Sequence, residues 1–466
     1  MWRQTMKRTV MMALMLVAIL GLATSASAKQ AAKPAPKASA GGTLDLEAAL
    51  SHGYVPAKAD KTIHARIQVR ADDAKAKERA PMNLAVVIDH SGSMAGGRLD
   101  QAKQAAHTLV DRLGESDRLA VVSYGNHVTT NMNSVFVTEA NKEKLHAAIS
   151  SIRLRGSTNL AGGFEKGASI VGEHPTDDSI NRVVLLSDGH ANIGAKTPHA
   201  LGKLASKYLE KGVSVSTMGI GLDYNEKLMA EMAKQGAGNY YFVEDEKKLA
   251  KIFAQEFETL SQVVARDAKL VLDIGAGVEL LDLHGFPYTN KRGKVTVKLG
   301  DFYARQHKDI MLDLSVSPRG EVRRDVVTAR LEFADVTKSN KRVHSKATLA
   351  AVGSDDQKQL AQVDKSVMRR VEQINYAKSV AKATDAYEKG DRKEAEKILA
   401  DQQKRLKDAQ NSYEFDADKV SEKVAELEEQ KKEMKRSRSS SSKSGKRLKK
   451  SSRKKMLDVM QSAEAF

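Results

Sequence analysis

The chain of 466 residues contains no cysteine. This absence excludes disulfide bonds, thiolate metal ligands, a cysteine nucleophile and a lipid anchor on an amino-terminal cysteine. Any metal site must therefore be built from oxygen or imidazole ligands.

Long apolar runs are also scarce, and the one exception lies near the start. Residues 1–28 combine a basic start, an apolar stretch over 10–23 and a small-residue cleavage site that ends at Ala28. This is the pattern of a signal peptide. An uncleaved anchor would need ~18 apolar residues, which is more than this stretch supplies. We expect an exported chain, periplasmic or extracellular, with no transmembrane segment in its mature part.

The net charge of +17 is concentrated near the carboxyl end. Residues 431–455 hold 13 Lys and Arg and a single Glu, so they carry +12 of the total. We expect a disordered basic tail over 433–466. Its charge suits an anionic envelope polymer or lipid. Residues 431–455 lack the aromatic side chains that stack on bases, which argues against nucleic acid.

Nearly continuous apolar runs alternate with helical patterns between residues 82 and 261. The runs LAVVID, RLAVVSYG, NRVVLLSDG and VSVSTMGIG suit strands that are buried on both faces of a mainly parallel sheet. Strands that alternate with helices over this length predict a doubly wound α/β domain over 82–261.

Period-two alternation, which is typical of half-buried strands, flanks this domain on both sides. It occurs at 61–70 and again at several places between 266 and 333. The first strand has no partners before the α/β domain begins, so we expect it to pair with the later strands. The fold class is then an α/β domain inserted into an antiparallel β-sandwich formed by residues 45–81 and 262–350.

Two further segments have their own composition. Residues 29–44 are rich in Ala, Pro and Lys and predict a flexible linker. Residues 356–432 have helical periodicity, and AYEKGDRKEAEKIL at 386–399 resembles half of a tetratricopeptide-type hairpin. No second copy occurs at a fixed period, so we expect one helical hairpin and not a repeat array.

Oxygen-bearing side chains stand where three segments of the α/β domain reach the same edge. Asp89 ends the first strand and is followed by Ser91 and Ser93, Thr158 precedes a helix, and Asp188 ends the strand VVLLSD. Ligands bind beyond the carboxyl ends of strands in open α/β sheets, so we expect the five side chains to converge. Hydroxyl and carboxylate oxygens suit Mg²⁺, Mn²⁺ or Ca²⁺. These five side chains leave one coordination position of the ion for a ligand from outside the chain, such as a carboxylate.

The motifs DxSxS, GSTNL and LLSDG resemble the metal-ion-dependent adhesion site of von Willebrand factor type A domains, and TMGIG and GNYYFV resemble the secreted bacterial members. The resemblance covers roughly 83–260. It implies that Ser91, Ser93 and Thr158 bind the ion directly, whereas Asp89 and Asp188 act mostly through bound water. It also implies a protein partner that supplies an exposed Asp or Glu.

We therefore favour an exported binding module that is not an enzyme, because no nucleophile–base pair accompanies the carboxylates. Two alternatives stay open. One is a metal-assisted hydrolase that uses the same ion as a Lewis acid, and the other is a cell-envelope scaffold anchored by its basic tail. The stretch GGFEKGAS has the glycine spacing of a phosphate loop but lacks the lysine, so nucleotide binding is not expected.

Overall fold

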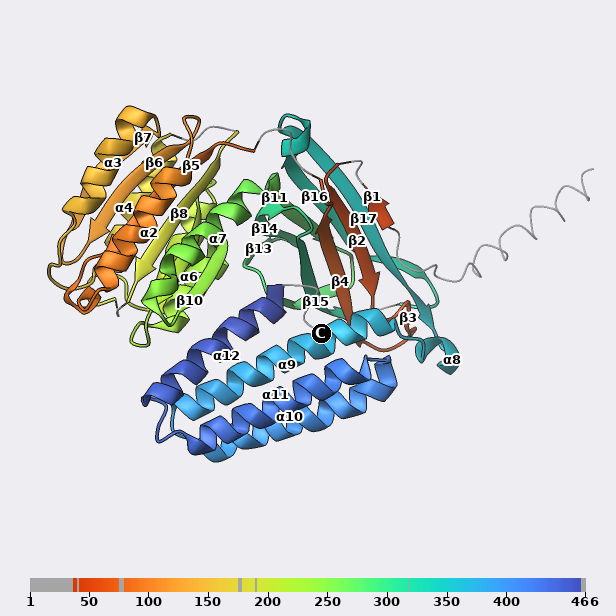
Figure 1. Ribbon diagram of the computed structural model, residues 1–466. Helices are drawn as coiled ribbons and strands as arrows, with labels where there is room; N and C mark the ends of the chain where they lie inside the picture. The colour runs from red at the N-terminus through yellow and green to blue at the C-terminus, as the bar shows by residue number, and fades with distance from the viewer. Residues whose placement is uncertain are drawn as a thin grey trace, which may run out of the picture.

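The computed structural model describes residues 37–39, 42–74, 79–174, 178–188, 191–317 and 319–461. The predicted signal peptide, residues 1–28, lies outside the described residues. Figure 1 shows three parts, which are an α/β domain, a β-sandwich beside it and a group of long helices below both.

A six-stranded sheet lies at the centre of the α/β domain, in the order β10-β9-β8-β5-β6-β7, and β7 alone of these strands runs antiparallel to its neighbour. Every residue of β5 and of β9 is buried, which explains their continuous apolar runs. Helices α2, α3 and α7 pack on one face and α4, α5 and α6 on the other, so the predicted doubly wound fold is confirmed. The elements are β5 (Met82–Asp89), η1 (Gly92–Met94), α2 (Arg98–Arg112), β6 (Arg118–Tyr124), β7 (Val128–Phe136), α3 (Glu139–Ser151), α4 (Leu160–Glu173), β8 (Ile180–Ser187), α5 (Pro198–Leu209), β9 (Ser214–Ile220), α6 (Glu226–Gln235), β10 (Ala237–Val243), η2 (Glu246–Lys248) and α7 (Leu249–Ser261).

Two sheets face each other in the sandwich, and their inner faces share one apolar core. The first sheet has the order β1-β2-β4-β15-β12 and the second β13-β14-β11-β16-β17-β3. All pairings are antiparallel except the short one between β3 and β17. The elements are β1 (Lys37–Ser39), β2 (Leu44–Leu50), β3 (Tyr54–Pro56), β4 (Lys61–Ala71), β11 (Val263–Ile274), β12 (Val278–His284), β13 (Tyr288–Lys291), β14 (Lys294–Tyr303), β15 (His307–Val316), β16 (Arg323–Asp335), η3 (Val336–Lys338) and β17 (Lys341–Ser354).

Strand β4 shows how the two domains are connected. It pairs along its length with β15, which lies more than 200 positions later in the chain. The chain enters the α/β domain after β4 and returns to the sandwich at β11, so the predicted insertion is confirmed. One expectation is corrected, because residues 37–39 of the segment predicted as a flexible linker form the edge strand β1 on β2.

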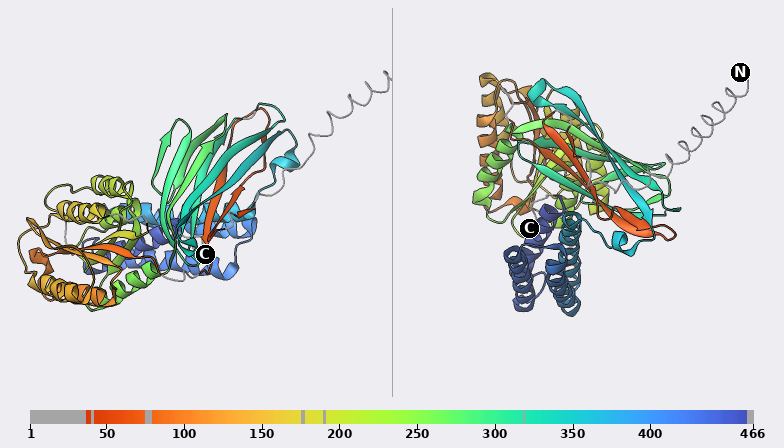
Figure 2. Two further views of the ribbon diagram at one scale, coloured as in Figure 1. Left: turned by 90° about the horizontal axis from the view of Figure 1, so that it is seen from above. Right: turned by 90° about the vertical axis from the view of Figure 1, so that its right-hand side faces the viewer.

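The helical region is larger than the predicted hairpin. Its elements are α8 (Gln357–Leu360), α9 (Lys365–Glu388), α10 (Arg392–Tyr413), α11 (Ala417–Arg436) and α12 (Lys443–Gln461). The four long helices share a core to which α9, α10, α11 and α12 all contribute. Figure 2 shows this bundle lying across both the α/β domain and the sandwich. No described helix has the length and apolarity needed to cross a membrane.

The prediction of a disordered tail over 433–466 was wrong for most of that segment. Residues up to Arg436 complete α11, and 443–461 form α12, which packs on α9, α11 and α6. Its apolar side chains Leu448 and Leu457 are buried, and its basic side chains meet acids of the α/β domain and of α9. The density of positive charge alone indicated a solvated chain. The paired acids offset the repulsion among the Lys and Arg side chains of α12, so the segment can fold.

Candidate metal centre

The first segment of the site is the turn that follows β5. Asp89 is fully buried at the end of this strand, and its Oδ1 accepts a hydrogen bond of 2.9 Å from the backbone N–H of Ser91. Its Oδ2 accepts one of 2.9 Å from the hydroxyl of Ser187, the last residue of β8. One carboxylate oxygen is thus held by the turn after β5 and the other by the end of the neighbouring strand β8, which orients the side chain at the sheet edge.

The hydroxyls of Ser91 and Ser93 lie between Asp89 and a second carboxylate, that of Asp188. Ser91 Oγ and Ser93 Oγ lie 3.0 Å apart, and Ser93 Oγ donates to Asp188 Oδ1 over 2.6 Å. Asp188 follows β8 directly and is fully buried. Four of the five predicted side chains therefore form one connected group across the ends of β5 and β8.

Thr158 reaches this edge through a separate loop. The loop is joined to the turn after β5 by two backbone hydrogen bonds, from Gly92 N to Gly156 O at 3.0 Å and from Arg155 N to His90 O at 2.7 Å. Thr158 is buried just before α4, whose N-cap Asn159 accepts a hydrogen bond from the backbone N–H of Gly162. The three predicted segments are thus adjacent in space.

Arg98 belongs to the same group, although the sequence did not single it out. Its Nη1 donates to Asp188 Oδ2 over 2.7 Å and to the carbonyl oxygen of Ser93 over 3.0 Å. Arg98 lies in the first turn of α2, and no motif marks it, since a single basic residue on a helix is usually solvated. Here its guanidinium supplies positive charge directly beside a predicted ligand.

Two fully buried carboxylates in one group carry an electrostatic cost. Burial raises the pKa of Asp89 to about 6, and the hydrogen bonds from Ser91 and Ser187 oppose that rise, whereas the nearby Asp188 adds to it. A dication at this position would lower the pKa again. Carboxylates and hydroxyls are hard oxygen ligands, and this donor set fits Mg²⁺, Mn²⁺ or Ca²⁺.

The comparison with known families agrees with this geometry. The model of the von Willebrand factor type A domain matches residues 83–255. Residues 83–255 are a von Willebrand factor type A (VWA) domain. VWA domains commonly mediate protein–protein interactions and typically bind a divalent metal ion at the metal-ion-dependent adhesion site. In this chain, the predicted oxygen ligands lie at the ends of β5 and β8 and in the loop before α4.

The sequence similarity to two known proteins extends beyond the VWA domain. The "Uncharacterized protein YfbK" of Escherichia coli (strain K12) is 28% identical over 260 residues, which cover 54% of this chain and 45% of that protein. The "Uncharacterized protein sll0103" of Synechocystis sp. is 27% identical over 285 residues, which cover 58% of this chain and 66% of that one. The chain thus spans less than two thirds of either relative.

A solved structure has the same overall architecture. The "von Willebrand factor type A from Catenulispora acidiphila" superposes with a TM-score of 0.69 and covers 91% of this chain and 99% of its own. At 15% sequence identity, this likeness shows the fold alone. It shows that the fold formed by the VWA domain, the sandwich and most of the helical region also occurs in another protein.

Proposed function

We propose that this chain is an exported binding protein whose VWA domain holds a divalent ion, and that this ion coordinates an acidic side chain of a protein partner. The observation that carries the proposal is the connected group of Asp89, Ser91, Ser93 and Asp188 at one sheet edge. Two carboxylates leave a bound dication close to neutral, so a third carboxylate from outside would be attracted by charge and by coordination together.

Each ligand has a distinct part in this proposal. Ser91, Ser93 and Thr158 would bind the ion through their hydroxyl oxygens, and Asp89 and Asp188 would hold bound waters. Ser93 is exposed although its neighbour Ser91 is buried, so the group is open to solvent on the side of Ser93. A partner carboxylate would approach from that side. Mg²⁺ keeps waters that such a ligand can replace.

The contacts of α12 weigh against the scaffold anchored by a free basic tail. Lys450 is buried, and Lys446, Arg447 and Arg453 are paired with acids of the same chain. Basic side chains engaged in this way are not available as a disordered polycation. The function therefore rests on the VWA domain, and the bundle holds that domain against the sandwich.

The test begins with the ion. Metal-stripped full chain is titrated with Mg²⁺ by calorimetry, beside Asp89→Ala and Ser93→Ala variants and the matched control Asp100→Ala. Asp100 is an exposed acid on α2 close to the site but outside the hydrogen-bonded group. We expect one ion per chain in the native protein and the control, and at least a tenfold loss of affinity in the two variants. Equal binding in all four proteins contradicts the site.

The partner is tested next, with the same variants. Native chain and Asp89→Ala are used as baits for envelope and medium fractions in Mg²⁺ and in EDTA. We expect a partner that is retained only by the native chain in Mg²⁺, and whose own Asp or Glu substitution abolishes binding. A partner retained equally under all conditions contradicts the ion-mediated contact.

Export is tested at the amino terminus. We expect the protein recovered from its native cell to begin at Lys29, because Ala28 ends the predicted cleavage site. Amino-terminal sequencing of the protein from periplasmic and medium fractions decides this. An intact first segment in the cytoplasmic fraction contradicts export.

A further inference from the structure

A second group of potential metal ligands lies outside the VWA domain, on the outer face of the first sandwich sheet. Asp282 on β12 and His64 on β4 are both direct cross-strand neighbours of Asp313 on β15. His284 stands two positions after Asp282 and so points to the same face. The strand register places all four side chains together, on the face opposite the apolar core.

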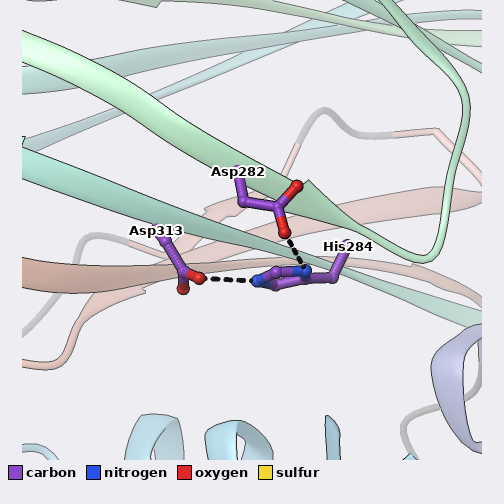
Figure 3. A group of neighbouring side chains, drawn as sticks. All are labelled: Asp282, His284 and Asp313. Carbon is purple, nitrogen blue, oxygen red and sulfur yellow. Dashed lines mark hydrogen bonds and ion pairs between the residues drawn. The ribbon is translucent and has the colours of Figure 1, made fainter. Parts of the chain in front are cut away.

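The contacts within this group are short and continuous. Figure 3 shows the ring of His284 between two carboxylates, with Nε2 2.8 Å from Asp313 Oδ2 and Nδ1 3.1 Å from Asp282 Oδ2. The other oxygen of Asp313 lies 2.7 Å from His64 Nδ1. The side chain of His284 is 5% exposed, that of Asp313 27% and that of Asp282 51%, so the group is buried at one end and open at the other.

The side chains of this group are of the kinds that can bind a metal ion. Asp282, His284 and Asp313 each offer one ligand atom, and the three atoms lie within 4.8 Å of one another. Tetrahedral zinc with bonds of about 2.0–2.1 Å separates its ligand atoms by about 3.3 Å. An ion on one ring nitrogen of His284 would replace the contact at that nitrogen, and the carboxylate at the other ring nitrogen would have to rotate toward the ion. A carboxylate held by a second hydrogen bond, as His64 holds Asp313, is the usual support of a metal ligand.

We propose that Asp282, His284 and Asp313 form a second metal site, for a divalent transition-metal ion of the Zn²⁺ class, with His64 as the positioning residue of Asp313. Imidazole with carboxylate selects such ions, whereas the all-oxygen set of the VWA domain suits Mg²⁺. The two carboxylates balance the charge of the ion. A fourth position stays open toward solvent.

One neighbouring cation competes with the ion. Lys378 of α9 lies 3.6 Å from Asp282 Oδ2, and its side chain is 39% exposed. It can withdraw into solvent when an ion takes this carboxylate. Its removal should therefore tighten zinc binding, which a purely structural role for the group would not predict.

The experiment uses the full chain, stripped of metal and kept in excess Mg²⁺ so that the VWA site is saturated. Zinc uptake is measured by calorimetry and by elemental analysis, with Co²⁺ absorption as a report of the ligand set. We expect one zinc per chain with a Kd below about 10 µM, at least tenfold weaker in Asp313→Asn and Asp282→Asn, and tighter in Lys378→Gln. His64→Gln should weaken binding about tenfold and leave the Co²⁺ band shape unchanged.

Two controls separate this site from the VWA site and from surface histidines. Asp89→Ala removes a predicted Mg²⁺ ligand, and His344→Gln removes an exposed histidine on β17. Both should bind zinc as the native chain does. Circular dichroism verifies the fold, and Asp282→Asn, at a half-exposed carboxylate, keeps the test valid if the Asp313 variant does not fold. Absence of zinc uptake up to about 100 µM, or uptake that neither carboxylate variant changes, overturns the proposal.

Discussion

Lys450 holds α12 against the VWA domain, and its replacement by alanine should release this helix. Its ammonium donates to the carbonyl oxygen of Tyr224 over 2.8 Å and to Glu226 Oε2 over 3.0 Å, and it lies 3.9 Å from the centre of the Tyr224 ring. The side chains of Lys450 and Glu226 are only 2% and 8% exposed. The variant would leave Glu226 buried without its cation.

The cost follows from this burial. Removing one partner of a buried ion pair destabilises by about 3–5 kcal/mol, because the other charge stays desolvated. At about 1.4 kcal/mol for each factor of ten, the population with α12 detached from α6 should rise roughly a hundredfold to several thousandfold. The remaining contacts of α12 with α9 limit how far the helix moves.

Limited digestion with trypsin measures this population, because α12 contains many Lys and Arg residues that its docked state protects. When reclosing is faster than cleavage, the rate tracks the open population. The matched control is Lys454→Ala, whose half-exposed side chain pairs with Asp458 within α12 and should change little. The double variant Lys450→Met with Glu226→Gln should recover protection, since no buried charge remains. Equal cleavage of Lys450→Ala, the control and the native chain would refute the reasoning.

Three further predictions concern the VWA site. Arg98→Gln should tighten Mg²⁺ binding severalfold in calorimetry, because the guanidinium no longer competes for Asp188. Mg²⁺ affinity should fall up to tenfold per pH unit below about pH 6, since the raised pKa of Asp89 lets a proton compete with the ion, and should level off above it. Gly125→Ala should lower Mg²⁺ affinity at least tenfold, because its Cβ would lie 2.3 Å from the carbonyl oxygen of Arg155 and push the Thr158 loop away.

Two of these predictions have a stated contradicting result, and the third has a control variant. Unchanged or weaker binding in Arg98→Gln would mean that the guanidinium orients Asp188 and does not compete with the ion. An affinity that is flat between pH 5 and 7 would contradict protonation of Asp89. Gly172→Ala is the control for the Gly125 variant. Its Cβ would lie 3.9 Å from Val213 Cγ2, which is an ordinary van der Waals contact, so this variant should bind Mg²⁺ normally.

The sequence by itself predicted the VWA domain, its position within the sandwich and the sheet edge at which Asp89, Ser93 and Asp188 meet. Buried strands must be apolar, so β5 and β9 were visible as continuous runs, and the polar residues that end a run mark the sheet edge. The lone alternating strand at 61–70 required a later partner, and β15 is that partner. These features depend on local pattern, which the order of residues contains directly.

Contacts between distant segments decided the rest. Arg98 contacts Asp188 across 90 positions of the chain, and Lys450 contacts Glu226 across 224. No periodicity in the sequence reveals pairs this far apart. Local composition predicts a disordered chain for the basic segment, because the acids that pair with it lie elsewhere in the sequence, on α6 and α9 and in the loops beside the VWA sheet. Only the paired strands β4, β15 and β12 bring His64, Asp313 and Asp282 together. Charge and ligand clusters depend on distance in space, and packing alone sets that distance.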